Sequence, residues 1–232
     1  MNSAIDWSVR RIEVKMYSNT HYEKYPNLKP WVGSKYGQSE VKKLLIIGES
    51  HYLPKGSVSA LDAEQWYAGN QGSLTDKEKS WINTSGIIEH NIPKNFPNKS
   101  HWIYRNVAKE INKVFLGYEN PANILDHVAF MNYFQRPAES EGGSINIKSL
   151  DLEVSDRTVT DVIKTLTPDL VVFCSSKAGK YGALIVRRLG VECIVAPHPS
   201  SQWWNRIAKS YGGFGRDIIP NFLVKHQWAK SA

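Results

Sequence analysis

Residues 170–196 have the sequence LVVFCSSKAGKYGALIVRRLGVECIVA, which predicts a buried strand, a helix and a second buried strand. The apolar runs Leu170–Cys174 and Val191–Ala196 are continuous rather than alternating, as is typical of strands covered on both faces. Between them, apolar or aromatic residues recur at helical spacing before a glycine stop: Ala178, Tyr181, Ile185, Leu189 and Gly190. Strand, helix and strand in this order indicate a parallel sheet.

Two more apolar runs, Leu44–Gly48 and Val128–Asn132, extend this pattern toward the N-terminus. Helical periodicity over Thr158–Leu166 predicts the crossover that precedes the third strand, and Pro168 favours its stop. Another amphipathic helix precedes the second strand, and its apolar face comprises Ile103, Val107, Ile111 and Val114. The sequence therefore predicts an α/β fold, a single three-layer domain with a central four-stranded parallel sheet.

The overall composition is typical of one soluble domain. Apolar residues make up 41% of the 232 residues, enough to bury a single substantial core. Lys and Arg total 29 against 22 Asp and Glu, and the net charge of +7 favours an anionic partner, whether nucleic acid, acidic membrane or phosphorylated metabolite. No run approaches about 18 uninterrupted apolar residues, so we expect no membrane span and a cytoplasmic protein.

Cofactor ligands are sparse in the sequence. Cys174 and Cys193 both lie within apolar runs and are expected to pack in the core. Zinc and iron–sulfur sites need several Cys or His ligands at short spacing, which this sequence lacks. We therefore expect no metal, no iron–sulfur cluster and no other cofactor, although a carboxylate-bound Mg²⁺ stays compatible with the composition.

The segment Leu53–Lys99 departs from the pattern, because Gly, Pro, Asn and Ser occur throughout it. A capping-box match at Thr75–Glu78 predicts one short helix there. An insertion directly after the first strand is expected to overlie the carboxyl edge of the sheet, where open α/β folds bind ligands, and an irregular structural cap is the equal alternative. No linker or internal repeat divides the chain, so residues 1–232 are predicted to form one domain, expected to be monomeric.

Polar side chains follow each of the four predicted strands. They are Glu49, Ser50, His51 and Tyr52 after the first, Asn132 at the end of the second, Ser175, Ser176 and Lys177 after the third, and His198, Ser200, Ser201, Gln202 and Trp203 after the fourth. Because the carboxyl ends of parallel strands meet at one edge, we expect these residues to form one site. Each has a structural alternative: a strand-end Asn favours turns, His-Pro-Ser favours a helix start, and Trp203 and Trp204 suit a core.

The order of these motifs resembles the uracil-DNA glycosylase superfamily, whose four-stranded parallel sheet carries a glycine-initiated motif, an Asn and a His-Pro-Ser after its first, second and fourth strands. The matching residues here are Gly48-Glu49-Ser50-His51-Tyr52, Asn132 and His198-Pro199-Ser200, and Gly212-Gly213-Phe214-Gly215 is similar to a later Gly-Phe-Phe-Gly stretch of the best-known branch. The resemblance extends over about Leu44 to Leu223. It implies a uracil-DNA glycosylase-like fold and an enzyme that excises bases from DNA.

The resemblance also implies roles for single residues. Asn132 matches the amide that hydrogen-bonds the flipped base, a task suited to a group with both a donor and an acceptor. His198 matches the histidine that donates to the departing base, and Tyr52 matches a tyrosine that excludes a 5-methyl group. Trp66 or Tyr67 is expected to stack on the base.

The DNA backbone has its own expected contacts. Hydroxyls, backbone amides and a cation suited to phosphates are present at Ser175, Ser176, Lys177, Ser200 and Ser201. Gln202 lies at the position of the wedge that fills the gap left by the flipped nucleotide. Because a wedge is normally apolar, Trp203 is the better physical candidate.

The sequence departs from the best-known branch at Ser50, where that branch has the aspartate that orients the attacking water. Glu49, directly beside it, matches a carboxylate of another branch, so we expect Glu49, Ser50 or His51 to hold the water. A positioned general base contributes about 10²–10⁴ to a rate, so its loss would slow such an enzyme without abolishing its activity. Two cysteines exclude the iron–sulfur branches.

Two other functions stay open. A binding protein that keeps the fold but not the reaction would hold nucleic acid or a nucleotide in the same cleft, as the substitution at Ser50 suggests. A serine esterase is the second alternative, because Gly48-Glu49-Ser50 resembles a Gly-Asp-Ser nucleophile block with Asn132 and His198 as partners. That family places Asp three residues before its histidine, and here that residue is Val195.

Overall fold

The structure is a computed structural model of the chain, and it describes residues 20–38, 41–57, 62–69, 74–115, 117–139, 143–208 and 212–229. At its centre lies a five-stranded sheet of order β1-β3-β2-β4-β5. The strands are β1 (Trp31–Val32), β2 (Leu44–Gly48), β3 (Val128–Asn132), β4 (Leu170–Phe173) and β5 (Glu192–Val195). Strands β2 to β5 are parallel, whereas β1 runs antiparallel beside β3.

The α/β class and the four parallel strands are thus confirmed, but the prediction of a purely parallel sheet is wrong. The strand that makes the sheet mixed is β1, which has only two residues and directly follows Pro30. A run that short has neither the alternation nor the apolar length that identifies a strand in a sequence.

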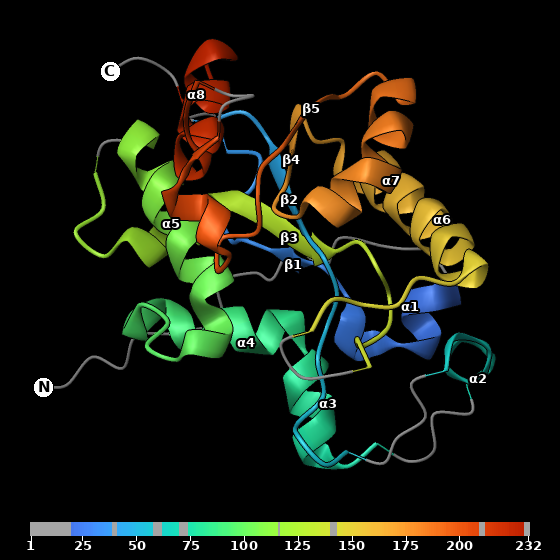
Figure 1. The fold of residues 1–232 in the computed structure, drawn as a ribbon. Helices are drawn as coiled ribbons and strands as arrows, with labels where there is room; N and C mark the ends of the chain where they lie inside the picture. The colour runs from blue at the N-terminus through green and yellow to red at the C-terminus, as the bar shows by residue number, and fades with distance from the viewer. Residues whose placement is uncertain are drawn as a thin grey trace, which may run out of the picture.

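Helices cover both faces of the sheet, which explains why β2, β3 and β4 are buried along their whole length (Figure 1). On one face lie α6 (Ser149–Leu166) and α7 (Ser176–Arg188), with α1 (Thr20–Lys24) and α2 (Ala63–Ala68) beside them. On the other face lie α5 (Trp102–Phe115), the 3-10 helix η4 (Pro121–His127) and α8 (Ile218–Lys225). Alternate residues of each strand enter the two clusters, as with Leu45 and Ile47 on the α6 side and Leu44 and Ile46 on the α5 side.

The crossover helix α6 begins at Ser149, nine residues before the predicted Thr158. The apolar periodicity stops early because a core-facing position is occupied by Asp151, whose carboxylate is fully buried against Arg136. A charged residue facing the core removes the signal on which the sequence prediction depended.

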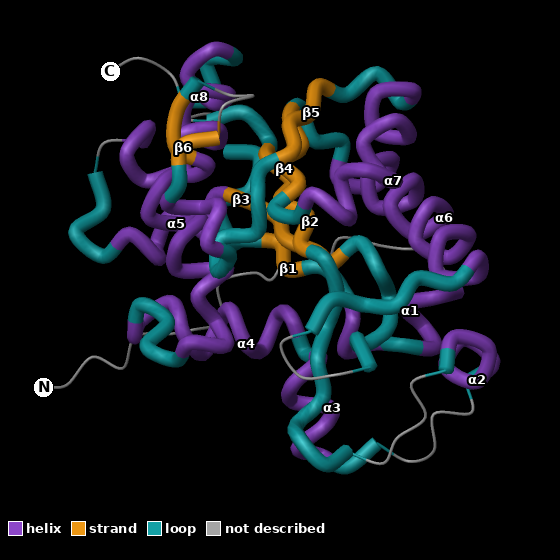
Figure 2. Tube along the Cα trace, in the orientation of Figure 1, coloured by secondary structure: helices purple, strands orange, loops and turns teal. Residues whose placement is uncertain are grey.

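The segment after β2 contains three short helices, α2, α3 (Asp76–Ile82) and α4 (Thr84–Asn91), followed by the 3-10 helices η2 (Ile92–Lys94) and η3 (Lys99–His101) (Figure 2). The capping box that the sequence predicted is present, because Thr75 Oγ1 accepts the Glu78 amide at 3.2 Å and Glu78 Oε2 accepts the Thr75 amide at 2.8 Å. Residues 58–61 and 70–73 lie outside the described part of this segment.

After β5 the chain forms the 3-10 helix η5 (Gln202–Asn205), an antiparallel pair of β6 (Ile207–Ala208) and β7 (Gly213–Phe214), and the 3-10 helix η6 (Gly215–Asp217). Two glycines of the Gly-Gly-Phe-Gly stretch have physical reasons. Gly212 has φ of 68°, and a Cβ on Gly215 would lie 2.3 Å from the carbonyl oxygen of Trp203. Gly215 therefore lets the turn lie directly against η5.

Candidate functional site

A cavity of about 520 Å³ opens at the carboxyl edge of the parallel strands. Its sheet side is lined by Glu49, Ser50, His51 and Tyr52 after β2, by Asn132 at the end of β3, and by His198 and Ser200 after β5. The opposite walls come from α3, α4 and the start of α5. The structure thus brings together the central residues that the sequence analysis selected, and the insertion forms part of their enclosure.

Gly48 makes room for the Asn132 side chain. The two residues are register partners in adjacent strands, and a Cβ on Gly48 would lie 2.3 Å from Asn132 Oδ1 and 3.0 Å from the Phe130 ring. Any other residue at position 48 therefore displaces the amide. Asn132 itself is 7% exposed, so its side chain has few alternative positions.

We expect Gly48→Ala to lower the free energy of unfolding by about 1–3 kcal/mol, because it overpacks a fixed contact. It should also weaken any ligand contact made by Asn132. Gly117→Ala is the matched control, since a Cβ there meets nothing within 4 Å. Urea denaturation of both variants measures the difference in stability. Equal stabilities would show that β2 and β3 accommodate the added methyl group without cost.

The amide of Asn132 forms a hydrogen bond with the buried His51. Asn132 Nδ2 lies 3.3 Å from both ring nitrogens of His51, and burial lowers the pKa of His51 to about 3. The imidazole is therefore neutral and keeps one unprotonated nitrogen that accepts from the amide. Oδ1 of Asn132 accepts no hydrogen bond from any residue in the described ranges, so this oxygen stays available to a ligand.

His198 is held with one defined proton position. The backbone N–H of Ser200 donates to His198 Nδ1 at 3.2 Å, which leaves the proton of the neutral ring on Nε2. Burial lowers the pKa of His198, and the nearby Glu49 charge opposes that shift. Asn106 of α5 donates to the carbonyl of Pro199 at 2.9 Å and fixes the loop. The cavity therefore contains a neutral N–H donor.

Glu49 is oriented by two hydroxyls. Ser175 Oγ donates to Glu49 Oε2 at 2.6 Å, and Ser144 Oγ donates to Oε1. Ser175 also caps α7, because its Oγ accepts the Ala178 amide at 3.2 Å. The prediction that the Ser175 hydroxyl binds a phosphate is therefore wrong, since this hydroxyl is buried and already bonds to Glu49 and the Ala178 amide.

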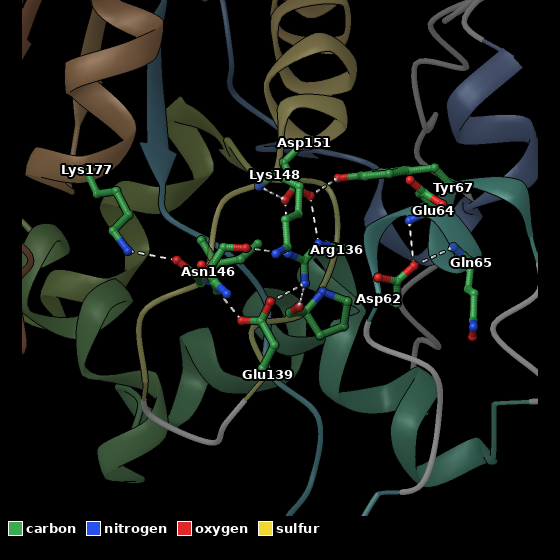
Figure 3. A network of polar contacts seen from close by, with 12 residues as sticks. Asp62, Glu64, Gln65, Tyr67, Arg136, Glu139, Asn146, Lys148, Asp151 and Lys177 are labelled. Carbon is green, nitrogen blue, oxygen red and sulfur yellow. Dashed lines mark hydrogen bonds and ion pairs between the residues drawn. The ribbon is translucent and has the colours of Figure 1, made fainter.

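The loop that carries Ser144 is fixed by a network centred on Arg136 (Figure 3). Arg136 makes a two-point contact with Asp151, at 2.7 and 3.0 Å, and donates to the carbonyl of Asn146 at 2.8 Å. From the other side, Lys177 Nζ donates to the carbonyl of Ile145 at 2.8 Å. Lys177 therefore helps to hold this loop, and because its ammonium has three N–H donors, the predicted phosphate contact stays a prediction.

The remaining residues that were predicted to contact DNA lie around the His-Pro-Ser turn and the start of α7. Ser200 lines the cavity, Ser176 is exposed, and Ser201 Oγ is buried with no hydrogen-bond partner within the described ranges. Gln202 and Trp203 are exposed on η5, outside the cavity wall. Trp203 is 54% exposed, so the core alternative is wrong for it, whereas Trp204 is buried.

Trp66 does not reach the cavity. It is fully buried, its indole N–H donates to the carbonyl of Gln135 at 3.0 Å, and its ring stacks on Tyr25. Tyr67 instead donates to Asp151 at 3.1 Å. The prediction that Trp66 or Tyr67 stacks on a base is therefore wrong, because both anchor the insertion to the α6 side of the sheet.

The aromatic cavity walls come from Tyr52, Trp81 and Tyr104. Sequence analysis missed Trp81 and Tyr104 because both lie on short or amphipathic helices where an aromatic residue indicates core packing. The described lining contains no Lys or Arg, and its acidic side chain is Glu49. The described chain also contains no group of three or more His, Cys, Asp or Glu placed to hold a metal ion. These walls suit a flat, largely neutral ligand.

The fold and site together define an α/β protein with a cavity at the carboxyl edge of its parallel strands, in which a few polar groups face apolar and aromatic walls. In comparisons with known proteins, neither a family model nor a curated protein matches the chain. Among the helices that the structure describes, none has the length and apolar character needed to cross a membrane.

Proposed function

We propose that this protein is a uracil-DNA glycosylase-like hydrolase that excises uracil or another modified base from DNA. The observation that carries the proposal is one cavity lined by an amide, a carboxylate and a neutral imidazole, from Asn132, Glu49 and His198. These are the three chemical groups that hydrolysis of an N-glycosidic bond uses for recognition, water activation and leaving-group stabilisation.

In the proposed reaction, a nucleotide flips out of the DNA and its base enters the cavity. Asn132 hydrogen-bonds the polar edge of the base, and the His198 Nε2–H donates to a ring carbonyl oxygen as negative charge develops there. The bond between the base nitrogen and C1′ breaks with its electron pair moving to the base. Water attacks C1′ and its proton passes to Glu49 and from there to the base anion, so the carboxylate is regenerated and the products are the free base and an abasic site.

Two surface features support DNA as the partner. The chain has a net charge of +7, which attracts phosphates. On the turn after His198, the Arg206 guanidinium lies 5.7 Å from the exposed Trp203 ring, and such pairs stack on bases. Ser50 takes no direct part in this proposal, because its buried hydroxyl has no hydrogen-bond partner within the described ranges and so no side chain that could accept its proton.

The direct test incubates the purified protein with single- and double-stranded oligonucleotides that contain uracil or other modified bases. We expect abasic product, and we expect His198→Ala to reduce the rate by about 10²–10³-fold, the loss typical of one donor to developing charge. The absence of abasic product from every modified base would overturn the proposal.

A pH profile separates this donor role from a structural one. Because burial lowers the pKa of His198 below its usual value, the ring stays neutral to a lower pH than an exposed histidine. As the pH falls further, protonation of Nδ1 removes the acceptor of the Ser200 N–H, so the wild-type rate should fall. This fall should be smaller in His198→Ala.

A catalytically inactive binding protein is the second candidate, and Ser50 in place of the expected aspartate favours it. This candidate predicts salt-sensitive DNA binding that survives His198→Ala, with no turnover in either form. The esterase alternative lacks a specific support, because Ser50 Oγ contacts no histidine among the described residues. Labelling of Ser50 by a fluorophosphonate would restore that alternative.

A further inference from the structure

The cavity contains a second buried amide, on the wall opposite the sheet. Asn91, the last residue of α4, is 6% exposed and lines the cavity. Its Nδ2 donates to the carbonyl of Ile87 at 2.8 Å, which fixes the orientation of the amide. Its Oδ1 receives no hydrogen bond from any residue whose position is described. The atom of the Asn91 side chain that stays available to a ligand is therefore Oδ1, a hydrogen-bond acceptor.

The cavity has room for more than a pyrimidine ring. Its volume of about 520 Å³ lies within the roughly 300–1,000 Å³ of pockets for drug-sized ligands, whereas uracil is much smaller. Trp81, Ile87 and Tyr104 provide apolar and aromatic surface near Asn91 on the insertion side. Because no Lys or Arg lies in this described lining, the extra space does not suit a phosphate.

Asn132 and Asn91 thus present amides from two separate elements, the carboxyl end of β3 and the C-terminal end of α4. Asn132 offers its oxygen at the sheet edge, and Asn91 offers its oxygen on the insertion wall. A ligand that satisfies only Asn132 leaves the second acceptor to water. A ligand that satisfies both needs a hydrogen-bond donor beyond the edge that Asn132 contacts.

We propose that the base held here carries an additional hydrogen-bond donor, a hydroxyl or amino group attached to the ring system, which Asn91 Oδ1 accepts. This inference rests on the proposed function and defines its substrate class as bases larger than uracil. An unpaired donor or acceptor in a closed site is costly, so the site discriminates against a base that lacks the group.

The test measures binding of nucleoside pairs that differ by one donor, by calorimetry on the full chain. The pairs are thymidine with 5-hydroxymethyl-2′-deoxyuridine, and deoxyinosine with deoxyguanosine, and deoxyuridine is the reference. We expect the donor-bearing member of at least one pair to bind about 3–10-fold more tightly, which corresponds to one net hydrogen bond. Asn91→Leu should remove this preference, so that the two members of each pair bind with equal affinity.

Two controls separate this inference from the proposed function. Asn132→Ala should weaken all five nucleosides together, and Glu89→Gln, an exposed change on the same helix, should alter none. Equal binding within both pairs, or a preference that survives Asn91→Leu, would overturn the inference while uracil excision still supports the glycosylase. The absence of both nucleoside binding and excision would reject the glycosylase and the inference with it.

Discussion

Glu49→Gln is expected to reduce the rate of base excision by about 10²–10⁴-fold, the range for loss of a positioned general base. Gln keeps the length of the side chain and still offers one oxygen and one NH₂ to the hydroxyls of Ser144 and Ser175, which rotate to suit. The cavity therefore keeps its shape. Only the capacity to take a proton from water is lost.

Single-turnover kinetics on a uracil-containing oligonucleotide measure this loss separately from DNA binding. The affinity for DNA should be unchanged or stronger, since a negative charge is removed from a site that faces a phosphate chain. Glu153→Gln is the matched control, because Glu153 is exposed on α6 and makes no contact with the cavity. Wild-type turnover by the Glu49→Gln enzyme would show that a group other than Glu49 activates the water.

The strands of the sheet were predictable because their signal is local. Leu44–Gly48 and Val128–Asn132 match β2 and β3 at both ends, since each is a short apolar run that follows a polar residue and ends at Gly48 or Asn132. The carboxyl ends of such strands meet at one edge, and this rule is sufficient to bring Glu49, Asn132 and His198 to one cavity.

The rest of the site depends on contacts that no local pattern encodes. Asn91 ends a short helix in an insertion, and Ser144 lies in a loop without periodicity. Their positions follow from how those segments pack. Trp66 shows the opposite error, because the resemblance implied that it stacks on the base, whereas its ring is the buried anchor of that segment.

The ion pair between Arg136 and Asp151 shows how the core and the site depend on each other. Both side chains are fully buried, and Arg136 also donates to the carbonyl of Asn146 in the loop that carries Ser144. The pair therefore fixes the start of α6 and the loop that orients Glu49. Loss of Asp151 leaves the buried Arg136 cation with the partly exposed Glu139, at 2.9 Å, as its remaining counter-charge.

We expect Asp151→Asn to lower the free energy of unfolding by about 1.5–3 kcal/mol, because Arg136 loses two charge-assisted hydrogen bonds and keeps only the partly exposed Glu139, at 2.9 Å, as a counter-charge. Urea denaturation followed by circular dichroism measures the change. Asp76→Asn is the control, since Asp76 pairs with Lys79 on the exposed surface of α3 and should change stability far less.

The double variant Arg136→Met with Asp151→Leu separates stability from positioning. Replacing both charges by apolar side chains should restore much of the stability, because no buried charge remains. Excision should stay impaired, since the Asn146 carbonyl has lost its donor and the loop that carries Ser144 is held less firmly against Glu49. Recovery of both stability and rate would show that the network stabilises the core alone and has no part in orienting the carboxylate.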